Sequence, residues 1–186
     1  MKNETLQHIA QRRTHRAYHA VQIGEDQLDT LMDVALSSPS ANNQQPWHFC
    51  VVQNQELLNS IHRAAADTAL GKAPANRSPR FDNTDFQVFY HAPTVIFLSC
   101  PADLPNTLID CGIAVQSIAL AAESMGLGSA ILGLPREAFA GKKKEEIERE
   151  LGFPPGHAFA IAIAIGYPSD DKPAHDKHPE KITLIR

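Results

Sequence analysis

Several short motifs that mark common enzyme classes are absent from this sequence of 186 residues. It has no Gly-x-Ser-x-Gly elbow, no Walker-type phosphate loop and no Gly-x-Gly-x-x-Gly dinucleotide fingerprint. Cysteine is scarce, since Cys50, Cys100 and Cys111 are the only three and none of them form a Cys-x-x-Cys pair. If the protein is an enzyme, we therefore expect a bound cofactor to supply the reactive group.

The chain also lacks a long apolar run and a strong charge of either sign. We find no stretch as long as a membrane span, and residues 1–5 have no apolar core, so neither a membrane segment nor a secretory signal is expected. A formal net charge of -4 argues against a general nucleic-acid binder. An odd number of cysteines makes a disulfide framework unlikely, which favours a cytoplasmic protein. The length predicts a single domain over residues 1–186.

Histidine is plentiful, with nine residues, but its spacing does not indicate a metal site. His15 and His19 are four apart, and His175 and His178 are three apart. Both pairs lie in predicted loops, and no third ligand has a suitable spacing. We predict surface histidines and no bound metal.

Apolar periodicity predicts an α+β fold, a three-layer sandwich of the α/β type. A helix that is apolar on most sides, at residues 110–125, is expected to be central. Residues 71–85 are expected to form a long mobile loop, and the apolar residues 182–185 are expected to dock onto another surface. Further helices are predicted near residues 4–12, 25–36, 57–61 and 135–151, and strands at 47–52, 94–98, 129–134 and 158–165.

Residues 12–16, Arg-Arg-Thr-His-Arg, form what we call the arginine stretch. A guanidinium presents a planar fork of donors that matches phosphate oxygens, and the Thr14 hydroxyl can complete the set. The alternative interpretation is that Arg12 and Arg13 complement the dipole at the end of the preceding helix and lie in solvent. Taken alone, the stretch favours this alternative, because short basic clusters usually lie on the surface.

A second polar cluster, residues 40–46, consists of small and amide side chains and is called the amide loop here. It has no apolar periodicity and precedes a strand, so it is predicted to be a loop. Its amides suit the polar edge of a ligand. Asn43 and Gln45 have a simpler alternative role, which is to satisfy the loop's own backbone.

Several stretches in this order resemble the nitroreductase family of flavin-mononucleotide (FMN) proteins. The similar segments cover essentially the whole chain: residues 12–18, 39–49, 110–128, 131–133 and 165–168. The resemblance implies a nitroreductase-like fold with a mostly antiparallel central sheet flanked by helices. It also implies a homodimer with FMN at the subunit interface.

The resemblance assigns a role to each part of the site. Arg12, Thr14 and Arg16 would hold the phosphate and polar parts of FMN, Arg13 would run alongside by its backbone, and Lys177 would join the phosphate. The flavin or ribityl chain would meet a loop that is partly supplied by the partner subunit, and its residues are Pro39, Ser40, Ala41, Asn43 and Gln45. Ile131, Leu132 and Gly133 would border the ring, with a backbone N–H near flavin N5, although ordinary core is the alternative for Ile131 and Leu132.

Three positions depart from the family pattern. Ser117 stands where many relatives carry Asn, and His175 stands where some place a second phosphate-binding Lys. The family's flavin-contacting Asn before Ala92 matches either Asn83 or Asp85, and the sequence leaves both open.

The function implied by the resemblance is an FMN-dependent oxidoreductase. It would transfer hydride from NAD(P)H through the flavin to a small nitroaromatic or quinone-like acceptor by a ping-pong mechanism, without a catalytic side chain. One alternative keeps the flavin and changes the reaction to reductive dehalogenation or flavin fragmentation. Another alternative is a non-catalytic flavin-binding sensor or storage protein. A third is a dimeric interaction module whose apolar C-terminal segment binds a partner.

Overall fold

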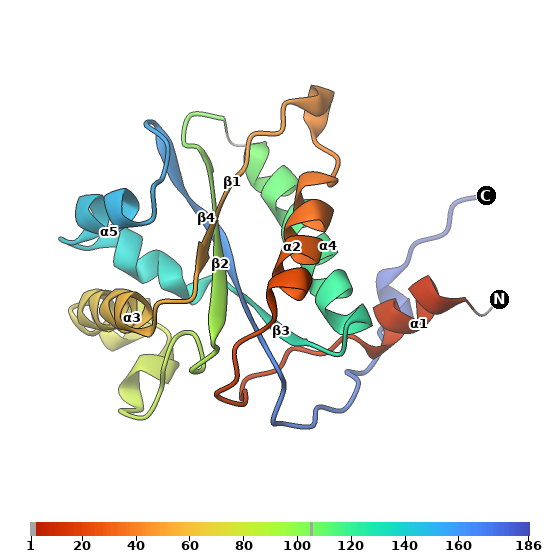
Figure 1. Cartoon of the computed structure of the whole chain (residues 1–186), viewed down its shortest axis with the longest axis horizontal. Helices are drawn as coiled ribbons and strands as arrows, with labels where there is room; N and C mark the ends of the chain where they lie inside the picture. The colour runs from red at the N-terminus through yellow and green to blue at the C-terminus, as the bar shows by residue number, and fades with distance from the viewer. Residues whose placement is uncertain (1–2, 105) are drawn as a thin grey trace.

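A four-stranded sheet divides the molecule into two helical layers (Figure 1). The structure is a computed structural model that describes residues 3–104 and 106–186. The helices are α1 (Glu4–Gln11), α2 (Glu25–Leu36), α3 (Gln55–Leu70), α4 (Thr107–Ser124) and α5 (Lys144–Glu150). The strands are β1 (His48–Val52), β2 (Thr94–Pro101), β3 (Gly128–Leu132) and β4 (His157–Gly166). Short 3-10 turns are η1 (Ala41–Asn43), η2 (Pro74–Asn76), η3 (Pro79–Asp82), η4 (Leu134–Ala140) and η5 (Pro179–Lys181).

The sheet has the strand order β1-β2-β4-β3, and every neighbouring pair is antiparallel. Alternate side chains of β4 pack in two different hydrophobic cores, one on each face of the sheet, because successive residues of a strand point to opposite faces. Ala162 and Ala164 pack in the core under α3, η4 and α5, whereas Ile163 and Ile165 pack in the core under α2 and α4. The predicted three-layer α+β arrangement with an antiparallel sheet is confirmed.

Helix α4 is only half buried, which corrects the prediction of a central helix. Its inner face is buried in the core beside the sheet, whereas Leu108 is 53%, Ile109 66% and Ile113 39% exposed. Contrary to the expectation that no stretch is as long as a membrane span, α4 is long and apolar enough to cross a membrane by length and composition alone. Its buried face is also what the core helix of a soluble fold presents, so this resemblance to a span is weak.

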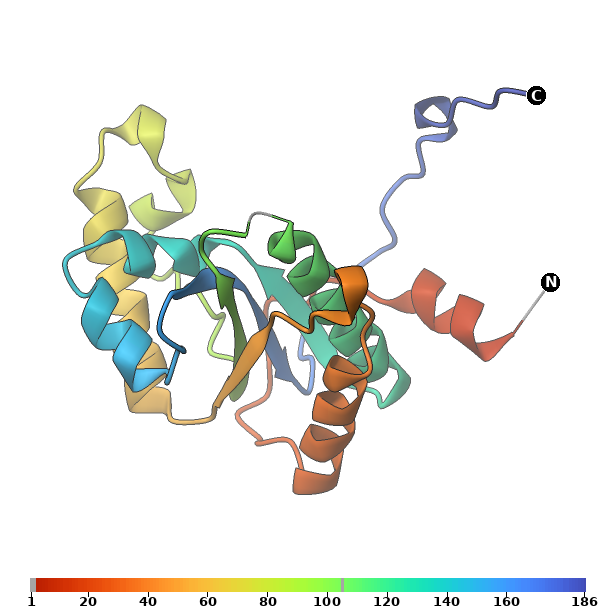
Figure 2. The ribbon, with the colours of Figure 1, turned by 90° about the horizontal axis from the view of Figure 1, so that it is seen from above.

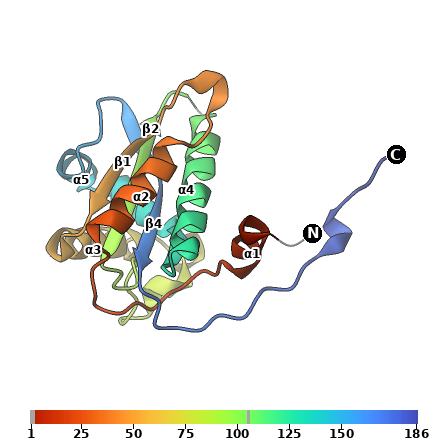
Figure 3. The ribbon, with the colours of Figure 1, turned by 45° about the vertical axis from the view of Figure 1, so that its right-hand side comes forward.

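Two further segments differ from expectation. Residues 71–85 contain the turns η2 and η3, and Phe81 is buried in a hydrophobic core at 6% exposure, so the segment is packed rather than a featureless loop. The C-terminal segment that follows β4 extends away from the body of the protomer (Figures 2 and 3). Leu184 is 69% and Ile185 90% exposed, so this apolar end is not covered by its own protomer, and its docking onto another surface stays a prediction.

Candidate functional site

The arginine stretch runs beside the start of β3. Asn3 caps α1 by accepting the Leu6 N–H, and the helix ends at Gln11, which places the stretch directly after it. Thr14 then forms an isolated parallel bridge with Ser129, and the His15 N–H donates to the Ser129 carbonyl at 3.0 Å. The stretch is therefore fixed against the edge of the sheet.

Asp170, which follows β4, fixes the stretch from the other side. Its Oδ2 accepts the Arg16 backbone N–H at 2.9 Å, and its Oδ1 lies 2.7 Å from His15 Nδ1. Burial raises the pKa of Asp170, but the hydrogen bonds from Arg16 and His15 and the charges of His15 and Lys172 outweigh it and lower the pKa below its usual value. His15 is 13% exposed at its side chain, so the prediction of a surface histidine is wrong for this residue.

The three guanidiniums of the stretch have different environments. Arg13 Nη1 donates to the carbonyls of Ala10 and Arg12 at 2.7 and 2.9 Å, so Arg13 satisfies the C-terminal end of α1. Within residues 3–104 and 106–186, neither Arg12 nor Arg16 forms an ion pair with a carboxylate. Arg13 therefore has the helix-end role that the alternative interpretation proposed. The guanidinium groups of Arg12 and Arg16 have donors that can bind an anion.

Arg16 also lines a hollow of about 350 Å³. Its guanidinium carbon lies 6.0 Å from the centre of the Tyr90 ring, within the range of a cation–π contact. Asn83 and Asp85, the two candidates for the flavin-contacting position, both line the same hollow. Asn83 and Asp85 therefore both lie beside Arg16, and either of them can occupy the flavin-contacting position.

The turn that carries Tyr90 is strained. Tyr90 and His91 both have φ of 56°, a left-handed conformation that is an outlier for bulky side chains. The buried Gln87 side chain accepts the backbone N–H groups of Phe89 and His91, and Arg80 donates to the Tyr90 hydroxyl. These bonds hold the Tyr90 ring beside Arg16, and strain of this kind often occurs at functional sites.

Strand β3 supplies an apolar surface next to the arginine stretch. Ile131 lies two residues beyond Ser129 on the same face of β3 and is 37% exposed, whereas Leu132 is 7% exposed and packs in the core. Gly133 is exposed at the end of the strand. Ile131 can therefore contact a ligand with its side chain, and the alternative of ordinary core holds for Leu132.

The amide loop lies at the opposite end of the protomer from the arginine stretch (Figure 1). Ser40 Oγ accepts the Gln45 N–H at 2.8 Å, and Gln45 Nε2 donates to Asn43 Oδ1 at 3.0 Å. Asn43 and Gln45 thus bind each other through their side chains, whereas Ser40 provides the side-chain bond to the loop's own backbone, which the simpler interpretation had given to Asn43 and Gln45. The neighbouring Pro39 and Ala41 are exposed.

One protomer consequently brings together only part of the predicted site. The arginine stretch, Ile131 and Gly133 share one edge of the sheet, but the amide loop does not join them. Lys177 lies in the C-terminal segment that projects from the body (Figure 3), where it is exposed. Among the described residues, no hydrogen bond joins the loop or Lys177 to the arginine stretch.

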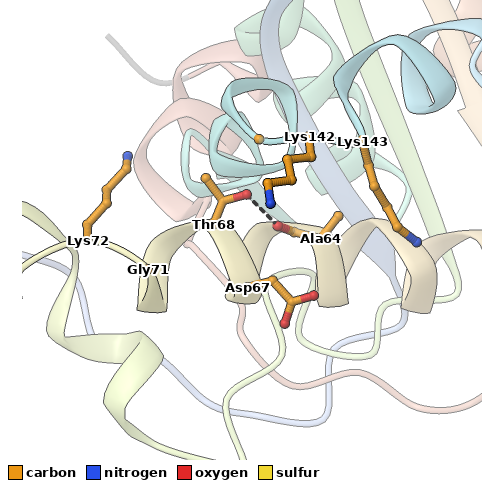
Figure 4. A pocket seen from close by; sticks show the side chains of 8 residues that line it. Ala64, Asp67, Thr68, Gly71, Lys72, Lys142 and Lys143 are labelled. Atoms are coloured by element: carbon orange, nitrogen blue, oxygen red, sulfur yellow. Dashed lines mark hydrogen bonds between the residues drawn. The ribbon is translucent and has the colours of Figure 1, made fainter.

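A larger hollow of about 540 Å³ lies elsewhere, between α3 and the segment that joins η4 to α5 (Figure 4). Lys72, Lys142 and Lys143 line it, with Asp67 and the Thr68 hydroxyl, which donates to the Ala64 carbonyl. Lys72 is already paired with the buried Glu137 at 2.5 Å. Helix α3 covers the sheet face opposite to α4, so this hollow is separate from the arginine stretch.

Sequence reasoning missed Asp170 and Tyr90. Asp170 lies 155 residues from His15, and no local motif surrounds it. Tyr90 follows Asn83 and Asp85 in the same segment. A tyrosine does not predict a left-handed backbone, so the sequence does not indicate the conformation of Tyr90. Only the spatial approach of both to the arginine stretch identifies them.

Comparison with known proteins gives one consistent result. The sequence model of the Nitroreductase family matches residues 9–167. The crystal structure of a nitroreductase with bound FMN from Desulfitobacterium hafniense superposes with a TM-score of 0.94 and 34% identity, and 100% of each chain is covered. A Methanothermobacter thermautotrophicus protein with the provisional name NADH dehydrogenase/NAD(P)H nitroreductase is 31% identical, over 98% of this chain and 87% of the relative. An iodotyrosine deiodinase of Thermotoga neapolitana is 25% identical, over 94% of this chain and 92% of the relative.

Proposed function

The chain belongs to the nitroreductase family, and on that premise we propose that it is an FMN-dependent oxidoreductase that uses NAD(P)H to reduce nitroaromatic or quinone-like acceptors. The D. hafniense relative is a nitroreductase with bound FMN, and the M. thermautotrophicus relative is named for NAD(P)H nitroreductase activity. Both cover nearly the whole chain, which supports the same cofactor and donor for this protein.

The observation that carries the proposal is the pair of guanidiniums at Arg12 and Arg16. Arg12 is half buried, and no carboxylate in the described residues neutralises either group. Charged side chains that are partly removed from water favour a counter-ion, and a phosphate matches the fork of a guanidinium. The exposed Ile131 beside them suits the apolar face of a flavin ring.

The partial site in one protomer supports a homodimer. The amide loop and Lys177 lie away from the arginine stretch, so a second copy is needed to complete the predicted set of contacts. The apolar residues of α4 (Leu108, Ile109 and Ile113), those of α1 and those of the C-terminal segment are exposed in the protomer and supply an apolar interface. We propose that two copies associate through these surfaces and that each cofactor meets residues of both.

Each group then has a positioning role. Arg12, Thr14 and Arg16, with Lys177, hold the phosphate and polar parts of FMN, and the backbone of Arg13 borders them. Ile131 and Gly133 border the ring, and Leu132 supports them from the core. Bound FMN supplies the hydride acceptor and donor at its N5 atom, so no side chain is assigned as acid or base. The protein orients the stacked rings and stabilises negative charge by nearby donors.

The test is cofactor retention followed by turnover. The purified protein is expected to be yellow or to bind added FMN, and to oxidise NADH or NADPH in the presence of a nitroaromatic or quinone. A colourless protein whose spectrum does not change with FMN contradicts every flavin-based function. A protein that binds FMN but oxidises neither nucleotide supports the sensor or storage alternative.

A mixed dimer tests how the site is shared. One protomer carries Arg12→Ala with Arg16→Ala, and its partner carries Asn43→Ala with Gln45→Ala. If each site combines the arginine stretch of one copy with the amide loop of the other, one site in the mixed dimer is intact and FMN binding returns there. If both clusters serve the same site within a copy, every site carries a defect and binding does not return.

Reductive dehalogenation is the second candidate, and the T. neapolitana deiodinase is the observation that favours it. Halide release from a halogenated tyrosine under reducing conditions, without nitroaromatic reduction, would replace the first proposal. A cytoplasmic location remains part of the proposal and is tested by fractionation.

A further inference from the structure

The amide loop is tied to α4 by a buried carboxylate. The Ala41 backbone N–H donates to Asp110 Oδ1 at 3.1 Å, and Asp110 is 4% exposed. Asp110 lies in the first turn of α4, where the helix dipole favours a negative charge. Among the described residues, this is the one hydrogen bond that joins residues 40–46 to another element.

The loop needs such a tie because its backbone is strained. Asn42, Asn43 and Gln45 have φ values of 52°, 53° and 47°. Asn tolerates this left-handed region better than Gln does, and each such residue costs free energy unless its surroundings hold it there. The bond from the Gln45 N–H to Ser40 Oγ closes the loop on itself, whereas the bond to Asp110 ties the closed loop to α4.

The second carboxylate oxygen argues against a purely structural role. Asp110 Oδ2 is buried and has no hydrogen-bond partner in the described parts of the chain. A buried acceptor without a partner destabilises a fold, and an Asn could make the same bond to Ala41 without placing a charge there. Asp110 therefore costs stability at the point where the predicted cofactor loop is anchored.

We propose that Asp110 is a positioning residue for the cofactor, which holds the amide loop in the conformation that receives FMN. The inference rests on the proposed function, since it deepens the role of the same site. Asp110 does not touch the cofactor in this scheme. It acts through Ala41, which sets the direction of the Asn43 and Gln45 side chains.

The first experiment compares Asp110→Ala, Asp110→Asn and Asp103→Ala by FMN titration of the apoprotein, with thermal unfolding measured in parallel. Asp103 is an exposed carboxylate before α4 with no hydrogen bond or ion pair to the described residues, so it is the matched control. Asp110→Ala is expected to raise the FMN dissociation constant about tenfold or more, as the loss of a charge-assisted bond predicts. Asp110→Asn keeps an acceptor for Ala41 but removes the negative charge, so it is expected to weaken FMN binding less than Asp110→Ala does.

The second experiment removes the donor in place of the acceptor, in case Asp110→Ala does not fold. Ala41→Pro deletes the N–H at an exposed position, and Ser40 already has φ of -140° and ψ of 158°, which suits a residue before proline. We expect Ala41→Pro to weaken FMN binding as Asp110→Ala does, and the double variant to add little to either.

Three outcomes separate the explanations. If Asp110→Ala lowers the unfolding temperature but binds FMN as tightly as the wild type, the role is structural and the inference is wrong. The inference is also wrong if the losses of FMN affinity in Asp110→Ala and Ala41→Pro add up in the double variant, because the two groups then act independently. If the wild type and Asp103→Ala bind no FMN, the proposed function itself has failed.

Discussion

Asp170 Oδ1 lies 2.7 Å from His15 Nδ1, and through this contact the segment after β4 holds the arginine stretch in place. The same carboxylate accepts the Arg16 N–H, so one side chain fixes two consecutive residues of the stretch. The geometry of Arg16 therefore depends on a residue that contributes no donor to an anion.

Replacing Asp170 should reduce stability in a pH-dependent way. Asp170→Ala removes both bonds and is expected to cost about 1.5 to 3 kcal/mol at neutral pH. The folded-state pKa of Asp170 lies below its usual value, so its contribution is present above the unfolded pKa, about 3.9. The contribution is lost as the pH falls through the lower folded pKa. Urea unfolding at pH 7 and near pH 3 measures this, and a difference from wild type that stays constant over that range would contradict the assignment.

The arginines should separate cofactor binding from folding. Arg12→Ala and Arg16→Ala are each expected to weaken FMN binding by about 1.5 to 3 kcal/mol, the range for a bond to a charged group. Arg13→Ala loses the bonds to Ala10 and Arg12, so it should lower stability by about 1 kcal/mol and leave FMN affinity nearly unchanged. Flavin fluorescence titration and thermal unfolding distinguish the two effects. Unchanged affinity in both Arg12→Ala and Arg16→Ala would remove the phosphate assignment.

Gly128 should not tolerate a side chain. A Cβ at this position would lie 2.8 Å from Pro168 Cβ and 3.0 Å from the His15 ring, closer than van der Waals contact. Gly128→Ala is expected to destabilise the protein by about 1 to 3 kcal/mol, the usual range for overpacking, and to push His15 from Asp170. Gly133→Ala is the control, because a Cβ there meets no atom within 4 Å. Equal unfolding temperatures for the two variants would show that the strand edge adapts freely.

The C-terminal segment should contribute to association and not to the fold of the protomer. Leu184 is 69% exposed, so Leu184→Asp is expected to leave the structure of the protomer intact. If a partner covers this side chain, the change loses about 1.5 to 3 kcal/mol of apolar burial and shifts the dimer toward monomer. Sedimentation velocity over a range of concentrations measures the shift, with Leu184→Met as the conservative control. A monomeric wild type would contradict the proposed dimer directly.

Much of the layer structure was predictable because its signals are local. The alternation of Ala and Ile in β4 and the apolar spacing in α2 are set by neighbours within a few residues. The exposed face of α4 was not predictable, because periodicity reports which residues are apolar and not whether a second subunit covers them. The same limit explains why residues 182–185 were expected to dock and are exposed in the protomer.

The sequence by itself determined the order of the elements, the resemblance to the family and the two polar clusters, since each depends on residue types at short spacing. Only the tertiary structure decided what each cluster does. Arg13 binds the end of α1, and Arg12 has no carboxylate partner among the described residues. Asp170, Tyr90 and Asp110 contact segments that are far away in the chain. Such contacts depend on how the sheet brings distant segments together, and one side of a long-range hydrogen bond carries no local sign of its partner.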